Sequence, residues 1–173
     1  MIGIQSALFI IGMTIGMVYG EGNQKVIVQS IKINDIADNP YFSQWAADIH
    51  SSGEKISFKT PFKQELPANM KVKLEISLDG DDLPEAEMDL CDIFDDDTLG
   101  KDLIEHGLPD GQFPTECPIQ GGDNFEVQDY PLPKDEKIPQ GTKDGPFHSV
   151  VSIYEEGKDP IIIIEADGEV MHY

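Results

Sequence analysis

Lys plus Arg total 12 against 33 for Asp plus Glu in this chain of 173 residues, a formal net charge of −21, yet 39% of the residues are hydrophobic. This length predicts a single domain, and the apolar content is sufficient for a packed core. The acidic excess excludes nucleic acid as a partner, because phosphate binding requires a basic surface.

The N-terminal segment, residues 1–20, contains no charged side chain. Its centre, residues 7–18, is an apolar run of the length found in secretory signal peptides, and Gly20 with Val18 forms a cleavage site. An uncleaved membrane anchor is the alternative, since residues 2–19 are just long enough to cross a bilayer. We expect a signal peptide over residues 1–20 and a mature domain over residues 21–173. The protein is then secreted, with the lysosome as an alternative destination.

Most of the mature chain is predicted to form β-strands. Alternating apolar residues or β-branched runs mark residues 25–34, 54–62, 70–78, 124–130, 147–154 and 160–170. In residues 25–34, the three isoleucines Ile27, Ile31 and Ile33 share one parity. The clearest alternation is in residues 70–78, where apolar and charged or polar side chains face opposite ways.

One stretch, residues 92–106, departs from this alternation. Its apolar residues, including Phe94, Leu99 and Leu103, have roughly helical spacing, and Gly107 is a stop signal. We expect one or two short helices there. The predicted fold is therefore mainly β, a two-sheet antiparallel β-sandwich or cup of immunoglobulin-like architecture with a short helical insertion.

The two cysteines are predicted to form a disulfide. In an oxidising compartment Cys91 and Cys117 pair with each other. A reactive thiol is the disfavoured alternative, because Cys91 lies between Asp89 and Asp92, and nearby negative charge does not favour a thiolate.

No motif in the sequence indicates catalysis. The acidic run at residues 95–97 fits no register of a calcium-binding EF-hand loop, the four histidines are isolated, and no serine lies in a nucleophile elbow. We therefore expect no catalytic residue, metal site or cofactor, and a protein that is not an enzyme.

The most informative segment is residues 89–133. It contains Asp89-Leu90-Cys91, then the predicted helix, then Cys117-Pro118-Ile119, and then a strand ending in Tyr130-Pro131-Leu132-Pro133. This order resembles the ML lipid-recognition superfamily, most of all its arthropod branch related to the ganglioside activator protein, which includes insect chemosensory proteins of the CheB type. The resemblance covers about residues 70–154. It implies a cup of two β-sheets whose interior holds a lipid, in a secreted or lysosomal carrier.

The cup implied by the resemblance would be lined by apolar side chains from the strands and the helical stretch. The candidates are Phe58, Val72, Leu74, Ile76, Phe94, Phe113, Phe125, Val127 and Ile153. Core packing explains each of them as well as ligand contact does. Two interpretations are also open for Tyr41, Phe42 and Trp45. They either contact a lipid interface or fold over the core and close it.

From these observations we expect a monomeric carrier of an apolar small molecule, namely a lipid, glycolipid, sterol or hydrophobic semiochemical. Because acid neutralises carboxylates, this carrier would make transient contact with membranes at acidic pH. The alternative function is a secreted interaction module of the same fold, with a filled core and an acidic binding surface.

Overall fold

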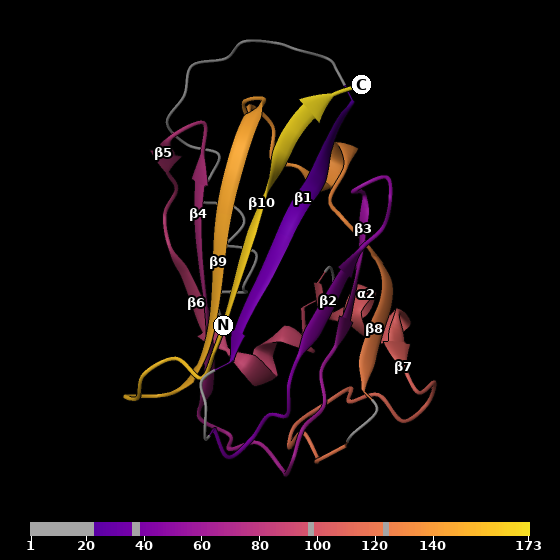
Figure 1. The fold of residues 1–173 in the computed structure, drawn as a ribbon, viewed down its shortest axis with the longest axis vertical. Coiled ribbons are helices and arrows are strands. Elements are labelled where there is room, and N and C mark those ends of the chain that lie inside the picture. The colour runs from indigo at the N-terminus through magenta and orange to yellow at the C-terminus, as the bar shows by residue number, and fades with distance from the viewer. Residues whose placement is uncertain (1–22, 36–38, 97–98, 123–124) are drawn as a thin grey trace.

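The structure, a computed structural model, describes residues 23–35, 39–96, 99–122 and 125–173. The predicted signal peptide lies outside the described residues. The described chain forms two antiparallel β-sheets connected by short helical segments (Figure 1). The predicted fold class, a two-sheet antiparallel β-sandwich with a short helical insertion, is thus confirmed.

The larger sheet, called sheet 1, contains the long strands. Its order is β1 (Gln24–Asp35), β10 (Ile162–His172), β9 (Gly145–Glu155), β4 (Met70–Leu78) and β5 (Asp81–Asp82), with β6 (Ala86–Asp89) also paired to β4. The central strands pair along most of their length, so their side chains align in rows that run across the sheet.

The smaller sheet, called sheet 2, has the order β2 (Ala46–Ile49), β3 (Lys55–Lys59), β8 (Glu126–Pro131) and β7 (Gly107–Leu108). The two sheets meet where β1 lies beside β2 (Figure 1). Near this junction the Val28 N–H donates to the Gly53 carbonyl at 2.9 Å. Gly53 has a φ of 70°, and a side chain on it would collide with Ile27, so glycine alone permits this approach.

Short helical segments connect the two sheets on the side away from β1 and β2. The 3₁₀ helix η2 (Leu90–Ile93) contacts β4 and β6 of sheet 1, whereas α2 (Leu99–Glu105) contacts β8 of sheet 2. The Asp96 side chain accepts a hydrogen bond from the Leu99 N–H at 2.6 Å and so caps the start of α2. The prediction of one or two short helices in residues 92–106 is confirmed. A further 3₁₀ turn, η3 (Asp135–Lys137), follows β8.

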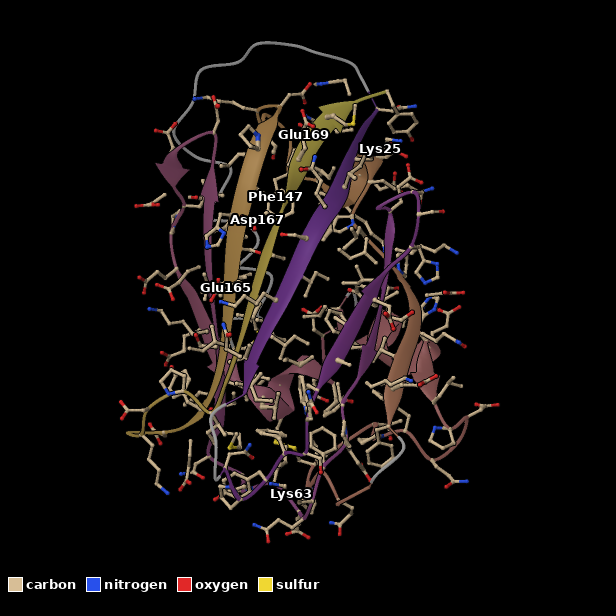
Figure 2. All side chains as sticks on the ribbon, viewed as in Figure 1. Lys25, Lys63, Phe147, Glu165, Asp167 and Glu169 are labelled. Atoms are coloured by element: carbon tan, nitrogen blue, oxygen red, sulfur yellow. A yellow bond between two sulfur atoms is a disulfide. The ribbon has the colours of Figure 1, made fainter. Side chains whose placement is uncertain are left out.

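The outer face of sheet 1 is mostly polar. Lys71 on β4 forms an ion pair with Asp89 on β6 at 2.6 Å, and His148 on β9 contacts Asp167 on β10 at 2.8 Å. Figure 2 shows Glu165, Asp167 and Glu169 along β10. The opposite, inner face of sheet 1 is apolar, and it faces sheet 2.

A β-bulge in β1 changes which of its isoleucines face inward. The register with β10 shifts between Val28 and Ser30, so Ile31 pairs with Ala166 on the inner face, whereas Ile27 pairs with Glu169 on the outer face. The shared parity of Ile27 with Ile31 and Ile33 was therefore misleading, because one inserted residue reverses the alternation.

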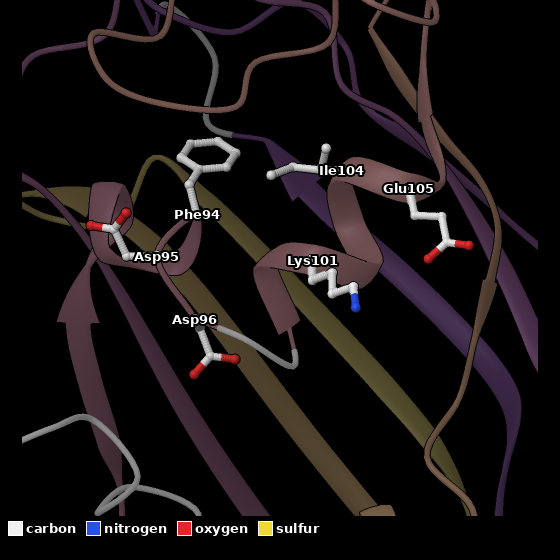
Figure 3. Close-up of a pocket in the computed structure, with 6 residues that line it drawn as sticks. All are labelled: Phe94, Asp95, Asp96, Lys101, Ile104 and Glu105. Carbon is white, nitrogen blue, oxygen red and sulfur yellow. The ribbon is translucent and has the colours of Figure 1, made fainter.

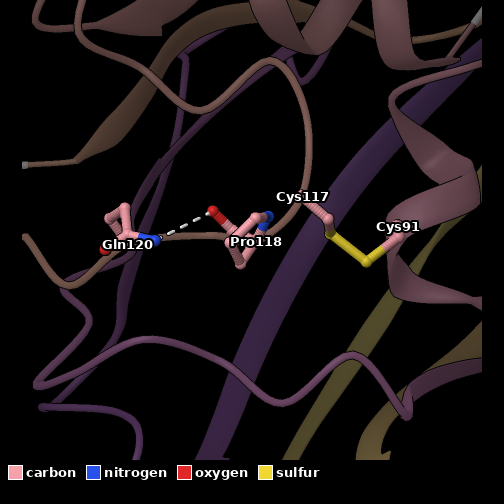
Figure 4. Close-up of a disulfide and its surroundings, with 4 residues drawn as sticks. All are labelled: Cys91, Cys117, Pro118 and Gln120. Atoms are coloured by element: carbon pink, nitrogen blue, oxygen red, sulfur yellow. Dashed lines mark hydrogen bonds between the residues drawn. A yellow bond between two sulfur atoms is a disulfide. The ribbon is translucent and has the colours of Figure 1, made fainter.

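One end of the sandwich is filled by a compact apolar cluster. Its buried members are Phe42, Phe62, Leu66, Met70, Ile119, Ile153, Ile161 and Ile162. The predicted disulfide joins Cys91 on η2 to Cys117 with Cα atoms 5.7 Å apart (Figure 4). Both the cluster and the disulfide hold the segment around Cys117 against sheet 1.

Candidate ligand-binding site

The middle of the inner face of sheet 1 is only half-buried. Two rows of side chains, called the inner rows, cross the sheet in register. The first row is Leu74, Val151, Ile164 and Ile33, and the second is Ile76, Ser149, Ala166 and Ile31. All of these residues face sheet 2, yet all keep some solvent exposure.

Buried residues border the inner rows at both ends. Toward the apolar cluster, Ile162 is 0% exposed and Ile153 is 6% exposed. Toward the other end, Val28 is 5% exposed and Leu78 is 9% exposed. A filled sandwich would bury its middle most completely, because the side chains of its two sheets interdigitate there. The inner rows are therefore less completely covered than Ile153, Ile162, Val28 and Leu78 at the two ends, although Ile33 and Ile164 still pack against the apolar cluster.

A surface pocket of about 350 Å³ lies at the helical connection between the sheets. Phe94 and Ile104 provide its apolar side chains, and its charged lining is three carboxylates with one cation, namely Asp95, Asp96, Glu105 and Lys101. Figure 3 shows Phe94 and Ile104 directed toward each other from the two helical segments, with strands passing behind them. The pocket thus combines apolar side chains with a mainly acidic rim.

The inner face of sheet 2 is more completely covered. Val127 on β8 is 3% exposed and Ile56 on β3 is 8% exposed, while Phe58 is half-buried. A second bulge lies opposite Ser57, where Asp129 has a φ of 58°. As a result Tyr130 pairs with Ile56 and faces inward, although it lies three positions after Val127.

Aromatic side chains form a continuous group at the apolar-cluster end. Phe42 lies 5.3 Å from Trp45 and 5.6 Å from Phe62, and Phe125 lies 5.9 Å from Phe62 and 6.0 Å from Phe113, all between ring centroids. Phe42 is 1% exposed, so it is part of the core plug rather than a surface contact. The Trp45 indole nitrogen is fully buried and has no hydrogen-bond partner in the described structure.

The predicted lining residues fall into five places. Leu74 and Ile76 belong to the inner rows. Val72 pairs with Ile153 beside the apolar cluster, and Phe113 and Phe125 belong to the aromatic group. The remaining candidates are Phe94 in the surface pocket and Phe58 with Val127 on sheet 2.

Several candidate residues were missed by sequence reasoning. The inner rows add Ile31, Ile33, Ser149, Val151, Ile164 and Ala166, and the pocket adds Ile104. All but Ser149 and Ile104 were visible as apolar residues of predicted strands. Their common row, however, depends on strand register, which one sequence does not provide.

No protein-family model and no curated protein matches the chain. Within the described ranges, no three His, Cys, Asp or Glu side chains gather as a metal site. None of the helices in the described part is long and apolar enough to cross a membrane.

Proposed function

We propose that the protein is a secreted, non-enzymatic carrier that holds an apolar ligand between its two β-sheets. The observation that carries this proposal is the half-buried state of the inner rows. Apolar side chains that face the interior of a sandwich but remain in contact with water are the lining that an apolar ligand requires.

The energetics favour occupancy of this space. Covering apolar surface gains about 25 cal/mol per Å² removed from water. Both inner rows consist of aliphatic side chains apart from Ser149, so a hydrocarbon ligand would bury them without leaving many polar groups unpaired.

Secretion is supported by the disulfide together with the apolar N-terminal run, since disulfides persist in oxidising compartments. The resemblance to the ML superfamily supports a carrier as well, because that resemblance implies a cup of two β-sheets. We propose membership of this superfamily on the sequence order of residues 89–133.

Two adjacent residues on β9 provide a matched test. Val151 belongs to the inner rows, whereas Val150 lies on the outer face, and both are half-buried. The variants Val151→Phe and Val150→Phe would be compared for binding of the neutral fluorescent probe N-phenylnaphthylamine and for stability in urea. We expect Val151→Phe to weaken probe binding at least about fivefold while Val150→Phe leaves it unchanged, because only the first side chain occupies ligand space.

The alternative function, an interaction module with a filled core, predicts a different pair of results. In a filled core, Val151→Phe overpacks the interior and costs about 1–3 kcal/mol of folding stability. That loss, combined with no probe uptake by the unmodified protein, would favour the interaction module. Retained stability with weakened binding supports the carrier.

A further inference from the structure

Tyr130 places a phenol hydroxyl inside the sandwich. Its register partner Ile56 is 8% exposed, and partners in an antiparallel ladder share one face, so the Tyr130 ring faces inward. The ring contacts His106 edge to face, with centroids 6.4 Å apart. Because α2 packs on β8, the ring lies between sheet 2 and the helical connection.

The Tyr130 hydroxyl has no hydrogen-bond partner among the described residues, unlike the hydroxyl of Tyr154, which donates to Glu87 at 2.5 Å. The Trp45 indole nitrogen is the one fully buried, unpartnered side-chain polar atom in the described structure. The Tyr130 hydroxyl must therefore retain contact with solvent. A polar group that is largely desolvated, unpartnered and still reachable is available to a ligand.

The charges near Tyr130 disfavour an anion. Asp96 lines the surface pocket, and Asp102 on α2 forms an ion pair with Lys137 at 2.5 Å. Burial, together with the negative charges of Asp102 and Asp96, raises the pKa of Tyr130 to about 12. The phenol therefore keeps its proton at neutral pH and can act as a hydrogen-bond donor.

We propose that Tyr130 is a specificity-determining residue, whose hydroxyl donates to an uncharged acceptor on an apolar ligand, such as an ester, ketone or alcohol. The nearby carboxylates disfavour free fatty acids and other anionic lipids. This inference rests on the proposed carrier function and names the chemical class of its ligand. The polar end of the ligand lies at α2, and its hydrocarbon body extends over the inner rows.

Three compounds of equal chain length separate the contributions of a neutral acceptor, a negative charge and the hydrocarbon chain to binding. Methyl oleate offers a neutral acceptor, oleate is an anion, and a terminal alkene of the same length has no polar acceptor. Each would displace N-phenylnaphthylamine from the unmodified protein, from Tyr130→Phe and from the control Tyr154→Phe, with thermal unfolding verifying that all three proteins are folded. Tyr154 is on the outer face of β9, so the control removes a hydroxyl away from the ligand space.

For the unmodified protein and for Tyr154→Phe, we expect methyl oleate to bind about three- to tenfold more tightly than the alkene, the value of one hydrogen bond. Oleate should bind at least about tenfold more weakly than methyl oleate, because its charge would be buried beside carboxylates. In Tyr130→Phe, methyl oleate and the alkene should bind equally, with the affinity for the alkene unchanged.

If Tyr130→Phe still bound methyl oleate more tightly than the alkene, by the same factor as the unmodified protein, the role of Tyr130 would be overturned. Tighter binding of oleate than of methyl oleate by the unmodified protein would overturn it as well. Either result would leave the carrier function intact. Failure of the unmodified protein to take up the probe and all three compounds would instead refute the carrier function itself.

Discussion

Ile162 and Ile164 offer a direct comparison between a packed core position and the proposed ligand space. Both lie on β10 and on the same inner face, where Ile162 pairs with Ile153 and Ile164 with Val151. Ile162 is 0% exposed, whereas Ile164 is half-buried. The same substitution, Ile→Ala, can therefore be made at both positions.

The expected losses of stability follow from this difference in exposure. Ile162→Ala removes about three methylene equivalents at about 0.8 kcal/mol each and leaves a closed cavity, so we expect a total loss of about 2–5 kcal/mol. Ile164→Ala removes atoms that already contact water, and solvent fills the gap, so we expect a loss of about 1–2 kcal/mol.

Equilibrium urea unfolding of both variants and the unmodified protein measures these losses, provided that the slope against urea is the same for all three. If Ile164→Ala cost as much as Ile162→Ala, Ile164 would be enclosed in a packed core. The inner rows would then be no ligand space, and the reasoning from their exposure would be refuted.

Three further predictions concern the disulfide and the charges. Replacing Cys91 and Cys117, which are 26 residues apart, with Ser should lower the free energy of unfolding in urea by about 3.5 kcal/mol, because the unfolded chain gains loop entropy. An unchanged free energy of unfolding would mean that the disulfide constrains the unfolded chain little. Hydrogen bonds from His172 and Gln24 hold the pKa of Asp144 below its ordinary 3.8, so this carboxylate stabilises the fold above that pH and ceases to do so as pH falls through its lowered pKa. The loss of stability caused by Asp144→Asn should therefore be smaller at about pH 2.5 than at about pH 5; an equal loss at both pH values would contradict the prediction. The fraction of protein that sediments with anionic vesicles should increase from about pH 7.5 to about pH 4.5, because the carboxylates are protonated, and high salt should make this increase smaller. Vesicle binding that does not change with pH would leave solubility as the role of the net charge of −21.

The long strands and the helical connection were predictable because each has a strong local pattern. The alternation in residues 70–78 gave β4 with the bounds that the structure has, Met70–Leu78. The short strands β2, β5, β6 and β7 were missed, since two to four residues are too few to establish an alternation.

The two β-bulges account for much of what the sequence pattern did not predict. The one in β1 separates Ile27 from Ile31, and the one in β8 turns Tyr130 inward, against the parity that Val127 predicts. Both depend on pairing with strands distant in the sequence. The exposure of the inner rows likewise depends on how far the two sheets separate, which is a property of tertiary packing.

The presence of an apolar molecule between the sheets is tested most directly by native mass spectrometry of the protein purified from its own source, with lipid analysis of an organic extract. We expect a protein mass increased by that of an apolar, uncharged molecule, which is released by organic solvent and appears in the extract. The mass of the disulfide-bonded chain alone, with no apolar molecule in the extract and no uptake of N-phenylnaphthylamine, would contradict the carrier function.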